Sequence, residues 1–184
     1  MPFNLLNTEI EEVKLIEPKK FPDDRGYFSE TYKKSNFTEM GLNGNFNQDN
    51  HSFSVRGTLR GLHFQNPPYA QGKLVRVVKG KILDVAVDIR RNSQTFGKYF
   101  KIELSGENMK SLWIPEGFAH GFAALADSYV IYKTTSEYSA SHERGIAWND
   151  PEISIDWPDG DHILSEKDMS YPTLKEQIQK GDIF

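Results

Sequence analysis

Short segments of alternating apolar and polar residues fill the middle of the chain, and no other feature constrains the fold as strongly. Turn sequences such as Ser105-Gly106 separate these segments. Alternation with a period of two is typical of β-strands, and many short strands at this spacing are typical of a sandwich or barrel. The first two strands flank Lys79-Gly80 and are predicted to pair as a hairpin. The expected strands are residues 73–78, 82–89, 99–104, 111–114, 121–125 and 129–135.

Helical signals occur in only two places. One short helix is expected at 35–40, and another is expected to start at Thr173, where Thr173 and Glu176 form a capping box, and to end near Gly181. The 184 residues contain no internal repeat and no Pro- or Ser-rich linker, and their number is typical of one domain. We therefore expect residues 1–184 to form a single all-β domain with a short N-terminal extension and a short C-terminal helix.

Composition excludes several kinds of protein. The sequence contains no cysteine, which rules out a disulfide scaffold, a thiolate zinc site and a cysteine nucleophile. Its start lacks the basic residues and the apolar run of a secretory signal. No stretch approaches the roughly 20 apolar residues that are needed to cross a bilayer. These features predict a cytoplasmic location without a membrane partner.

Charge is distributed unevenly in a chain whose net charge is −4. Residues 56–110 carry eleven Lys and Arg against four Asp and Glu, whereas residues 137–184 carry four against eleven. A basic middle suits an anionic small molecule such as a sugar nucleotide, although lysine-rich strand exteriors would give the same count. The acidic overall balance and the lack of a lysine-rich run argue against nucleic acid as a partner.

Histidine spacing indicates a particular kind of barrel. Pro115, Gly117 and His120 have the Pro-x-Gly-x-x-His spacing of the second cupin motif, in which the turn directs the histidine into the barrel. A metal-binding cupin also needs an earlier His-x-His and a Glu, because one imidazole cannot hold a divalent ion alone. The earlier candidate at 63–65 reads His-Phe-Gln, and no Glu follows it before Glu103. The sequence therefore predicts a cupin barrel without a metal.

Residues 56–65 place two arginines and a histidine among glycines in a strand-like run. Glycine within a strand often marks a bulge or the close approach of a ligand, and a bulge would let Arg60 and His63 converge. A strand histidine is more often structural than catalytic, but the nearby Arg60, Gln65 and Lys73 favour a catalytic role for His63. Histidine, with an ordinary pKa of about 6.5, is the natural base for proton abstraction beside a ketone.

Such a reaction needs two further groups. A cation or hydrogen-bond donor must stabilise the enolate oxygen, and Lys73 is a candidate for this role. Inversion also needs a proton donor on the opposite face of the sugar, which Tyr132 on its predicted strand would supply. On pattern alone, an aromatic residue in the barrel core explains Tyr132 better.

Taken together, the motifs resemble the dTDP-4-dehydrorhamnose 3,5-epimerase family over about residues 21–168. The resemblance implies a metal-free and cofactor-free isomerase with a cupin-type jelly roll, which usually forms homodimers. It would epimerise C3 and C5 of dTDP-4-keto-6-deoxy-D-glucose to dTDP-4-keto-L-rhamnose, a step in dTDP-rhamnose and cell-surface polysaccharide biosynthesis. The matching segments, in the order and near the spacing of the family, are 21–28 (FPDDRGYF), 47–52 (NQDNHS), 59–65 (LRGLHFQ), 70–75 (AQGKLV), 84–90 (DVAVDIR), 113–122 (WIPEGFAHGF), 148–150 (WND) and 164–168 (LSEKD).

The resemblance also implies roles for individual residues. His63 would be the base and Asp168 its carboxylate partner, a pairing that no local pattern suggests. Tyr132 would be the acid, and Lys73 would stabilise the enolate oxygen. Phe21 and Tyr138 would stack on the nucleotide base, with some contacts supplied by the partner subunit. The residues with an implied role in substrate binding are Phe21, Arg25, Glu30, Gln48, Asp49, Asn50, Arg60, Lys73, His120, Tyr138, Glu143 and Lys167.

Three alternatives stay open on the sequence. The chain departs from the family pattern at 66–69 and at 136–138, and some relatives epimerise a single carbon, so a mono-epimerase of a nucleotide-linked 4-keto-6-deoxy sugar is one alternative. The second is a metal-dependent cupin, against which the missing His-x-His argues. The third is a sugar-binding jelly roll without catalytic activity.

Overall fold

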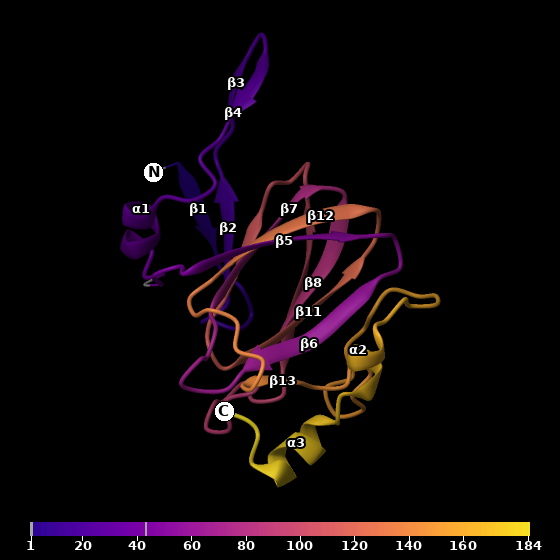
Figure 1. Cartoon of the computed structure of the whole chain (residues 1–184). Helices are drawn as coiled ribbons and strands as arrows, with labels where there is room; N and C mark the ends of the chain where they lie inside the picture. The colour runs from indigo at the N-terminus through magenta and orange to yellow at the C-terminus, as the bar shows by residue number, and fades with distance from the viewer. Residues whose placement is uncertain (1, 43) are drawn as a thin grey trace.

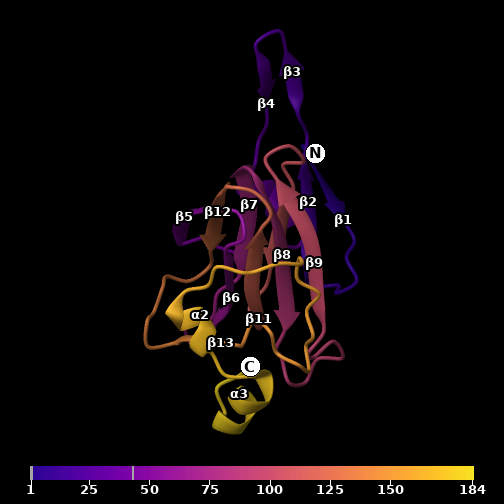
Figure 2. The same ribbon diagram turned by 90° about the vertical axis from the view of Figure 1, so that its right-hand side faces the viewer.

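The computed structural model describes residues 2–42 and 44–184. These residues form two antiparallel sheets that pack face to face (Figures 1 and 2). In spatial order, the first sheet contains β1 (Phe3–Leu6), β2 (Lys14–Pro18), β10 (Ser111–Ile114), β7 (Lys73–Lys79), β12 (Ser128–Thr134) and β5 (Gln48–Ser54). The second contains β13 (Glu143–Gly145), β6 (Leu59–Gln65), β11 (Phe118–Ala124), β8 (Lys81–Asp88) and β9 (Tyr99–Ser105).

The second sheet is covered on both faces, which explains why its strands are so apolar. On the inner face, Ile82 and Phe122 pack against Val75 and Val130 of the first sheet. Residues of the opposite face of β8, such as Val85, belong to a second apolar cluster. The C-terminal part of the chain supplies the other half of that cluster, with Ile146, Ile153, Trp157 and Leu174. Every residue of β11 is buried as a result.

The hairpin predicted for residues 73–78 and 82–89 is wrong. β7 pairs with β10 and β12 in the first sheet, whereas β8 pairs with β9 and β11 in the second. The Lys79-Gly80 corner therefore carries the chain from one sheet to the other. Gly80 adopts a φ of 87°, and a Cβ there would lie 2.2 Å from the carbonyl oxygen of Asp127. The corner is too tight for any other residue.

The helices are short and lie at the ends of the sequence. α1 (Lys34–Glu39) begins one residue before the predicted helix. α3 (Leu174–Lys180) has the predicted capping box between Thr173 and Glu176 and ends at Gly181 in a left-handed conformation. α2 (Glu166–Ser170) is a second C-terminal helix, which was not predicted from the sequence. No helix in the described part of the chain is long and apolar enough to span a membrane.

A two-stranded hairpin projects from the body of the molecule (Figure 1). It consists of β3 (Phe21–Asp23) and β4 (Gly26–Phe28), which pair with each other and with no other described strand. Its aromatic side chains are strongly exposed: Phe21 is 43% exposed, Tyr27 55% and Phe28 66%. Among the aromatic rings of the described residues, Phe21 and Phe28 pair only with each other, with centroids 6.4 Å apart, and much of their apolar surface stays exposed.

A β-bulge shapes the strand pair that carries two histidines. His63 lies opposite His120 and Arg60 lies opposite Phe122, so β6 contains one residue more than β11 between these points. Gly61 lies within the bulge with a φ of 129°, and a Cβ there would lie 2.5 Å from the Cα of Gly121. The predicted bulge is thereby confirmed, and Arg60 and His63 line the same cavity.

Candidate active site

A cavity of about 320 Å³ lies in the barrel, and a smaller one of about 160 Å³ adjoins it. His63, Lys73 and Tyr132 line both. His63 lies on β6 of the second sheet, whereas Lys73 and Tyr132 lie on β7 and β12 of the first. The larger cavity is also lined by Gln48, Asn50, Tyr138 and Glu143, and the smaller by Arg60 and His120.

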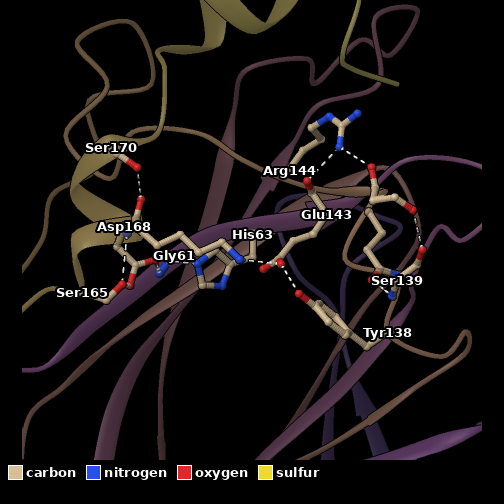
Figure 3. Close-up of polar contacts among 12 residues, drawn as sticks. Gly61, His63, Tyr138, Ser139, Glu143, Arg144, Ser165, Asp168 and Ser170 are labelled. Carbon is tan, nitrogen blue, oxygen red and sulfur yellow. Dashed lines mark hydrogen bonds and ion pairs between the residues drawn. The ribbon is translucent and has the colours of Figure 1, made fainter.

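His63 forms a tight pair with Asp168. The two residues are 105 positions apart in sequence, and His63 Nε2 lies 2.5 Å from Asp168 Oδ1 (Figure 3). Ser165, the N-cap of α2, donates its hydroxyl to Asp168 Oδ2 at 2.7 Å, and the Gly61 amide donates to Oδ1 at 3.4 Å. Burial alone would raise the pKa of Asp168, but the hydrogen bonds from His63 and Ser165 hold it below its usual value. Asp168 is therefore a carboxylate at neutral pH.

A second histidine–carboxylate pair lies nearby. His120 Nε2 is 2.8 Å from Asp84 Oδ1, and both residues are buried. Burial lowers the pKa of His120, even though the Asp84 charge acts in the opposite direction. The imidazole is therefore neutral at neutral pH, and its Nε2 is bound to Asp84 beside the smaller cavity.

Lys73 and Tyr132 have environments that suit charge stabilisation and proton donation, respectively. The Lys73 ammonium donates to the carbonyl oxygen of His63 at 3.3 Å. Burial lowers the pKa of Lys73 to about 8, against the opposing charges of Asp84 and Glu143, so the side chain is mostly cationic at pH 7. Burial raises the pKa of Tyr132, which keeps its phenol protonated.

A hydrogen-bonded network borders the larger cavity. The Tyr138 hydroxyl donates to Glu143 Oε2 at 2.6 Å (Figure 3). Lys167 Nζ lies 2.5 Å from the same oxygen. Gln48 accepts from the Tyr138 amide at 2.8 Å and donates to Asn50 at 2.8 Å. Five residues that the family resemblance assigned to substrate binding are thus linked around one opening.

Four other predicted residues lie outside the cavities of their own chain. Asp49 is on the outward-facing side of β5 and pairs with Lys133 at 2.7 Å. Phe21 and Arg25 belong to the projecting hairpin, where Arg25 pairs with Asp23 at 2.7 Å. Glu30 follows the hairpin and lines neither cavity. A role for Phe21, Arg25 or Glu30 at an active site therefore requires a second subunit.

Within residues 2–42 and 44–184, no three His, Asp or Glu side chains converge as a set of metal ligands. His63 and His120 are cross-strand neighbours, but each forms a hydrogen bond with a different carboxylate. The arrangement places two carboxylate-bound imidazoles beside a cation and a phenol. It is suited to moving protons at a carbon next to a carbonyl group.

A family model described as dTDP-4-dehydrorhamnose 3,5-epimerase matches residues 7–176. The dTDP-4-dehydrorhamnose 3,5-epimerase of Shigella flexneri is 53% identical over 169 residues, which are 91% of this chain and 93% of that protein. The chain belongs to the dTDP-4-dehydrorhamnose 3,5-epimerase family. The resemblance seen in the sequence motifs is thereby confirmed.

Solved structures of this epimerase family share the fold. The dTDP-6-deoxy-D-glucose-3,5-epimerase of Legionella pneumophila Philadelphia 1, in complex with dTDP-4-keto-L-rhamnose, matches with a TM-score of 0.94 and 44% identity, covering 98% of this chain and 97% of that one. A 3'-monoepimerase from Streptomyces bikiniensis, in complex with dTDP-quinovose, matches with a TM-score of 0.90 and 30% identity, covering 96% and 91%. The predicted all-β, cupin-type fold is confirmed by this likeness.

Sequence reasoning missed three residues beside the epimerase histidines. Asp84 was placed on a strand but not paired with His120; a charged residue alternating with apolar ones was the available signal. Ser165 caps α2 and also donates to the Asp168 carboxylate, and neither contact was predicted from the sequence. Tyr171 packs against His63, and no sequence pattern pointed to it.

Proposed function

We propose that this family member inverts C3 and C5 of dTDP-4-keto-6-deoxy-D-glucose by proton transfer, with His63 as the base and Tyr132 as the acid. The activity is that of a dTDP-4-dehydrorhamnose 3,5-epimerase, the name carried by the Shigella flexneri relative. One observation carries the residue roles: His63 and Tyr132 line the same cavity from opposite sheets. A carbon between them loses its proton to one wall and gains a proton from the other, which inverts it.

The His63–Asp168 pair prepares the base. With the Asp168 carboxylate accepting from Nε2–H, the lone pair of the neutral imidazole is on Nδ1. The carboxylate then stabilises the imidazolium that forms when Nδ1 takes the proton. Because the hydrogen bonds from His63 and Ser165 keep the pKa of Asp168 low, the proton stays on His63 and does not pass to the carboxylate.

Lys73 supports the developing enolate. When a C–H bond beside the C4 ketone breaks, its electron pair becomes part of an enolate whose charge is on the C4 oxygen. The buried Lys73 ammonium lies in the wall shared by both cavities, where a cation is far more effective than in water. One C–H bond breaks and one forms at each carbon, so the proton count balances without a redox partner.

The remaining lining residues fit the rest of the substrate. Arg60 and His120 border the smaller cavity and would contact the sugar. Gln48, Asn50 and Glu143 border the larger one, with Tyr138 and Lys167 bound to Glu143, and would hold the nucleotide. A substrate linked to a nucleoside diphosphate supports a cytoplasmic location.

We further infer that the enzyme acts as a homodimer, with the β3–β4 hairpin reaching the site of the partner. The exposed Phe21, and Arg25 in the turn of the same hairpin, line neither cavity of their own chain. A second apolar surface on the outer side of β5 and β12 includes Phe53 and Tyr129, which are 46% and 40% exposed. Their rings are in contact, with centroids 4.9 Å apart.

Deuterium exchange tests the reaction and its base. The purified protein is incubated with dTDP-4-keto-6-deoxy-D-glucose in D₂O, and C3 and C5 are followed by NMR beside a His63→Ala control. We expect deuterium at both carbons, the rhamnose configuration in the product, and no exchange with the control. Label at one carbon would identify a mono-epimerase, and exchange that survives in His63→Ala would remove His63 from the role of base.

Subunit mixing tests the dimer. Arg25→Ala and His63→Ala should each be inactive as homodimers. After the two are denatured together and refolded, about half of the molecules should be mixed dimers with one intact site. Recovery of activity supports the shared site. No recovery, or a monomeric mass by light scattering, contradicts it.

A further inference from the structure

The strand position opposite His63 has an unusual occupant. β13 pairs with β6, and Gly145 is the direct cross-strand neighbour of His63. Such a neighbour normally packs its side chain against that of its partner, but glycine has none. A Cβ on Gly145 would lie 2.5 Å from three ring atoms of Tyr171. The Tyr171 ring therefore occupies the space that a side chain at 145 would fill.

From this space the Tyr171 ring contacts the imidazole of His63. The two ring centroids are 5.5 Å apart and the planes make an angle of 66°, an edge-on arrangement that is favourable for aromatic pairs. Tyr171 directly follows α2, the helix that carries Asp168 and lies beside β6 (Figure 1). One short segment thus supplies the His63 ring with both a hydrogen-bonding carboxylate and an aromatic wall.

A single hydrogen bond does not fix an imidazole. The bond to Asp168 holds Nε2, but the ring can still tilt about this contact because the outer torsion of histidine is broad. An aromatic wall against the ring blocks that tilt. We propose that Tyr171 is a positioning residue that holds the His63 imidazole so that Nδ1 points into the cavity. This inference rests on the proposed role of His63 as the base.

The ring of Tyr171, and not its hydroxyl, carries the proposed role. Tyr171 lines neither cavity, and its hydroxyl oxygen is buried. Burial, followed by the charge of Glu143, raises the pKa of Tyr171 to about 12, so the hydroxyl gives up no proton near neutral pH. Phenylalanine at this position should therefore preserve the positioning, whereas alanine should abolish it.

Two substitutions remove the wall in different ways. Tyr171→Ala truncates the ring, and Gly145→Ala displaces it while leaving it intact. Each should lower kcat about 10-fold to 100-fold with KM within threefold of wild type, because a misplacement of about 1 Å can cost this much. Tyr171→Phe should retain most of kcat. The double variant should be no slower than Tyr171→Ala, since a Cβ at 145 meets no ring there.

Controls distinguish a loss of imidazole positioning from misfolding and from a wrong assignment of His63 as the base. Met169→Ala lies on the same helix, is 61% exposed and should match wild type. Nitrogen-15 NMR of the imidazole should show one ordered Nε2–H tautomer in wild type and Tyr171→Phe, and averaging in Tyr171→Ala. If Tyr171→Ala does not fold, Gly145→Ala gives the same test with the ring retained.

Wild-type kcat in Tyr171→Ala and Gly145→Ala, a loss confined to KM, or an unchanged imidazole spectrum in either variant would overturn the positioning role. An active His63→Ala would instead overturn the assignment of the base. The two failures are therefore distinguishable in one set of assays.

Discussion

Replacing Asp168 with Asn is the sharpest perturbation that the geometry allows. The substitution keeps the size of the side chain and removes only its charge. It acts on a partly buried pair with Nε2 and Oδ1 2.5 Å apart, in which the carboxylate also accepts from Ser165 at 2.7 Å. An amide presents an N–H group to Nε2 and so favours the tautomer with the proton on Nδ1. The nitrogen that should act as the base then has no free lone pair.

The magnitude follows from the loss of a buried charge partner. Depriving a buried ion of its partner costs about 3–5 kcal/mol, which is the upper range for the partly exposed imidazolium that forms in the transition state. At 1.36 kcal/mol for each factor of ten, kcat should fall about 100-fold to 5,000-fold. In the proposed mechanism the imidazolium forms only after substrate binds, so the ground state loses much less, and KM should change little.

The assay is steady-state turnover together with thermal unfolding. Asp168→Asn should melt close to wild type, while Asp168→Ala, which also leaves a cavity, reports the cost of losing the contact altogether. A kcat within fivefold of wild type would refute the reasoning, because the carboxylate would then have no role in stabilising the imidazolium. A large loss of stability with normal kcat per folded molecule would make the pair structural.

Two further predictions concern pH. Because the pKa of Lys73 is about 8, kcat/KM should fall above pH 8 as the ammonium loses its proton, and Lys73→Met should be slow at every pH and lack this alkaline decline. The folded-state pKa of Asp168 is depressed, so its contribution to stability is present above the unfolded value of about 3.9. That contribution disappears as pH falls through the folded value, and acid unfolding of Asp168→Asn should therefore be shallower than that of wild type.

Local sequence patterns predicted β7 to β12 together with α1 and α3, but they missed β1 to β5, β13 and α2, and they did not predict how the strands pair. The boundaries of β10 and the capping box at Thr173 follow from signals within a few residues. The pairing of β7 and β8 was predicted wrongly because a Lys-Gly turn looks the same whether it reverses a strand within one sheet or passes to the other. That difference depends on which strands arrive later in the chain, namely β10, β11 and β12.

In the candidate active site, too, local sequence patterns do not show which distant residues come into contact. The bulge that brings Arg60 and His63 to one cavity was predictable, because the glycines lie in the same strand. The pairing of His63 with Asp168 spans 105 residues, and only the family resemblance suggested it. Tyr171 reaches His63 through the space that Gly145 leaves on a neighbouring strand. No linear pattern connects three residues on three separate elements.

Because His63 and Tyr132 line the cavity from opposite sheets, hydrogen exchange and inversion of configuration can be separated by mutation. A base alone can remove a proton and return a deuteron to the same face, which gives exchange with retention. Inversion needs the second wall, where burial keeps the Tyr132 phenol protonated by raising its pKa. Tyr132→Phe should therefore still incorporate deuterium from D₂O beside the ketone, but inversion at a carbon that takes its new proton from Tyr132 should fall at least about 100-fold.

The measurement is NMR of recovered substrate and product, with His63→Ala as the variant that loses both events. Recovery of deuterated substrate with unchanged configuration would mean that Tyr132 acts only after the enolate has formed. Loss of exchange together with inversion would mean that Tyr132 is needed to form the enolate, and the assignment of separate base and acid walls would have to be abandoned. Full inversion in Tyr132→Phe would require another donor on the first sheet.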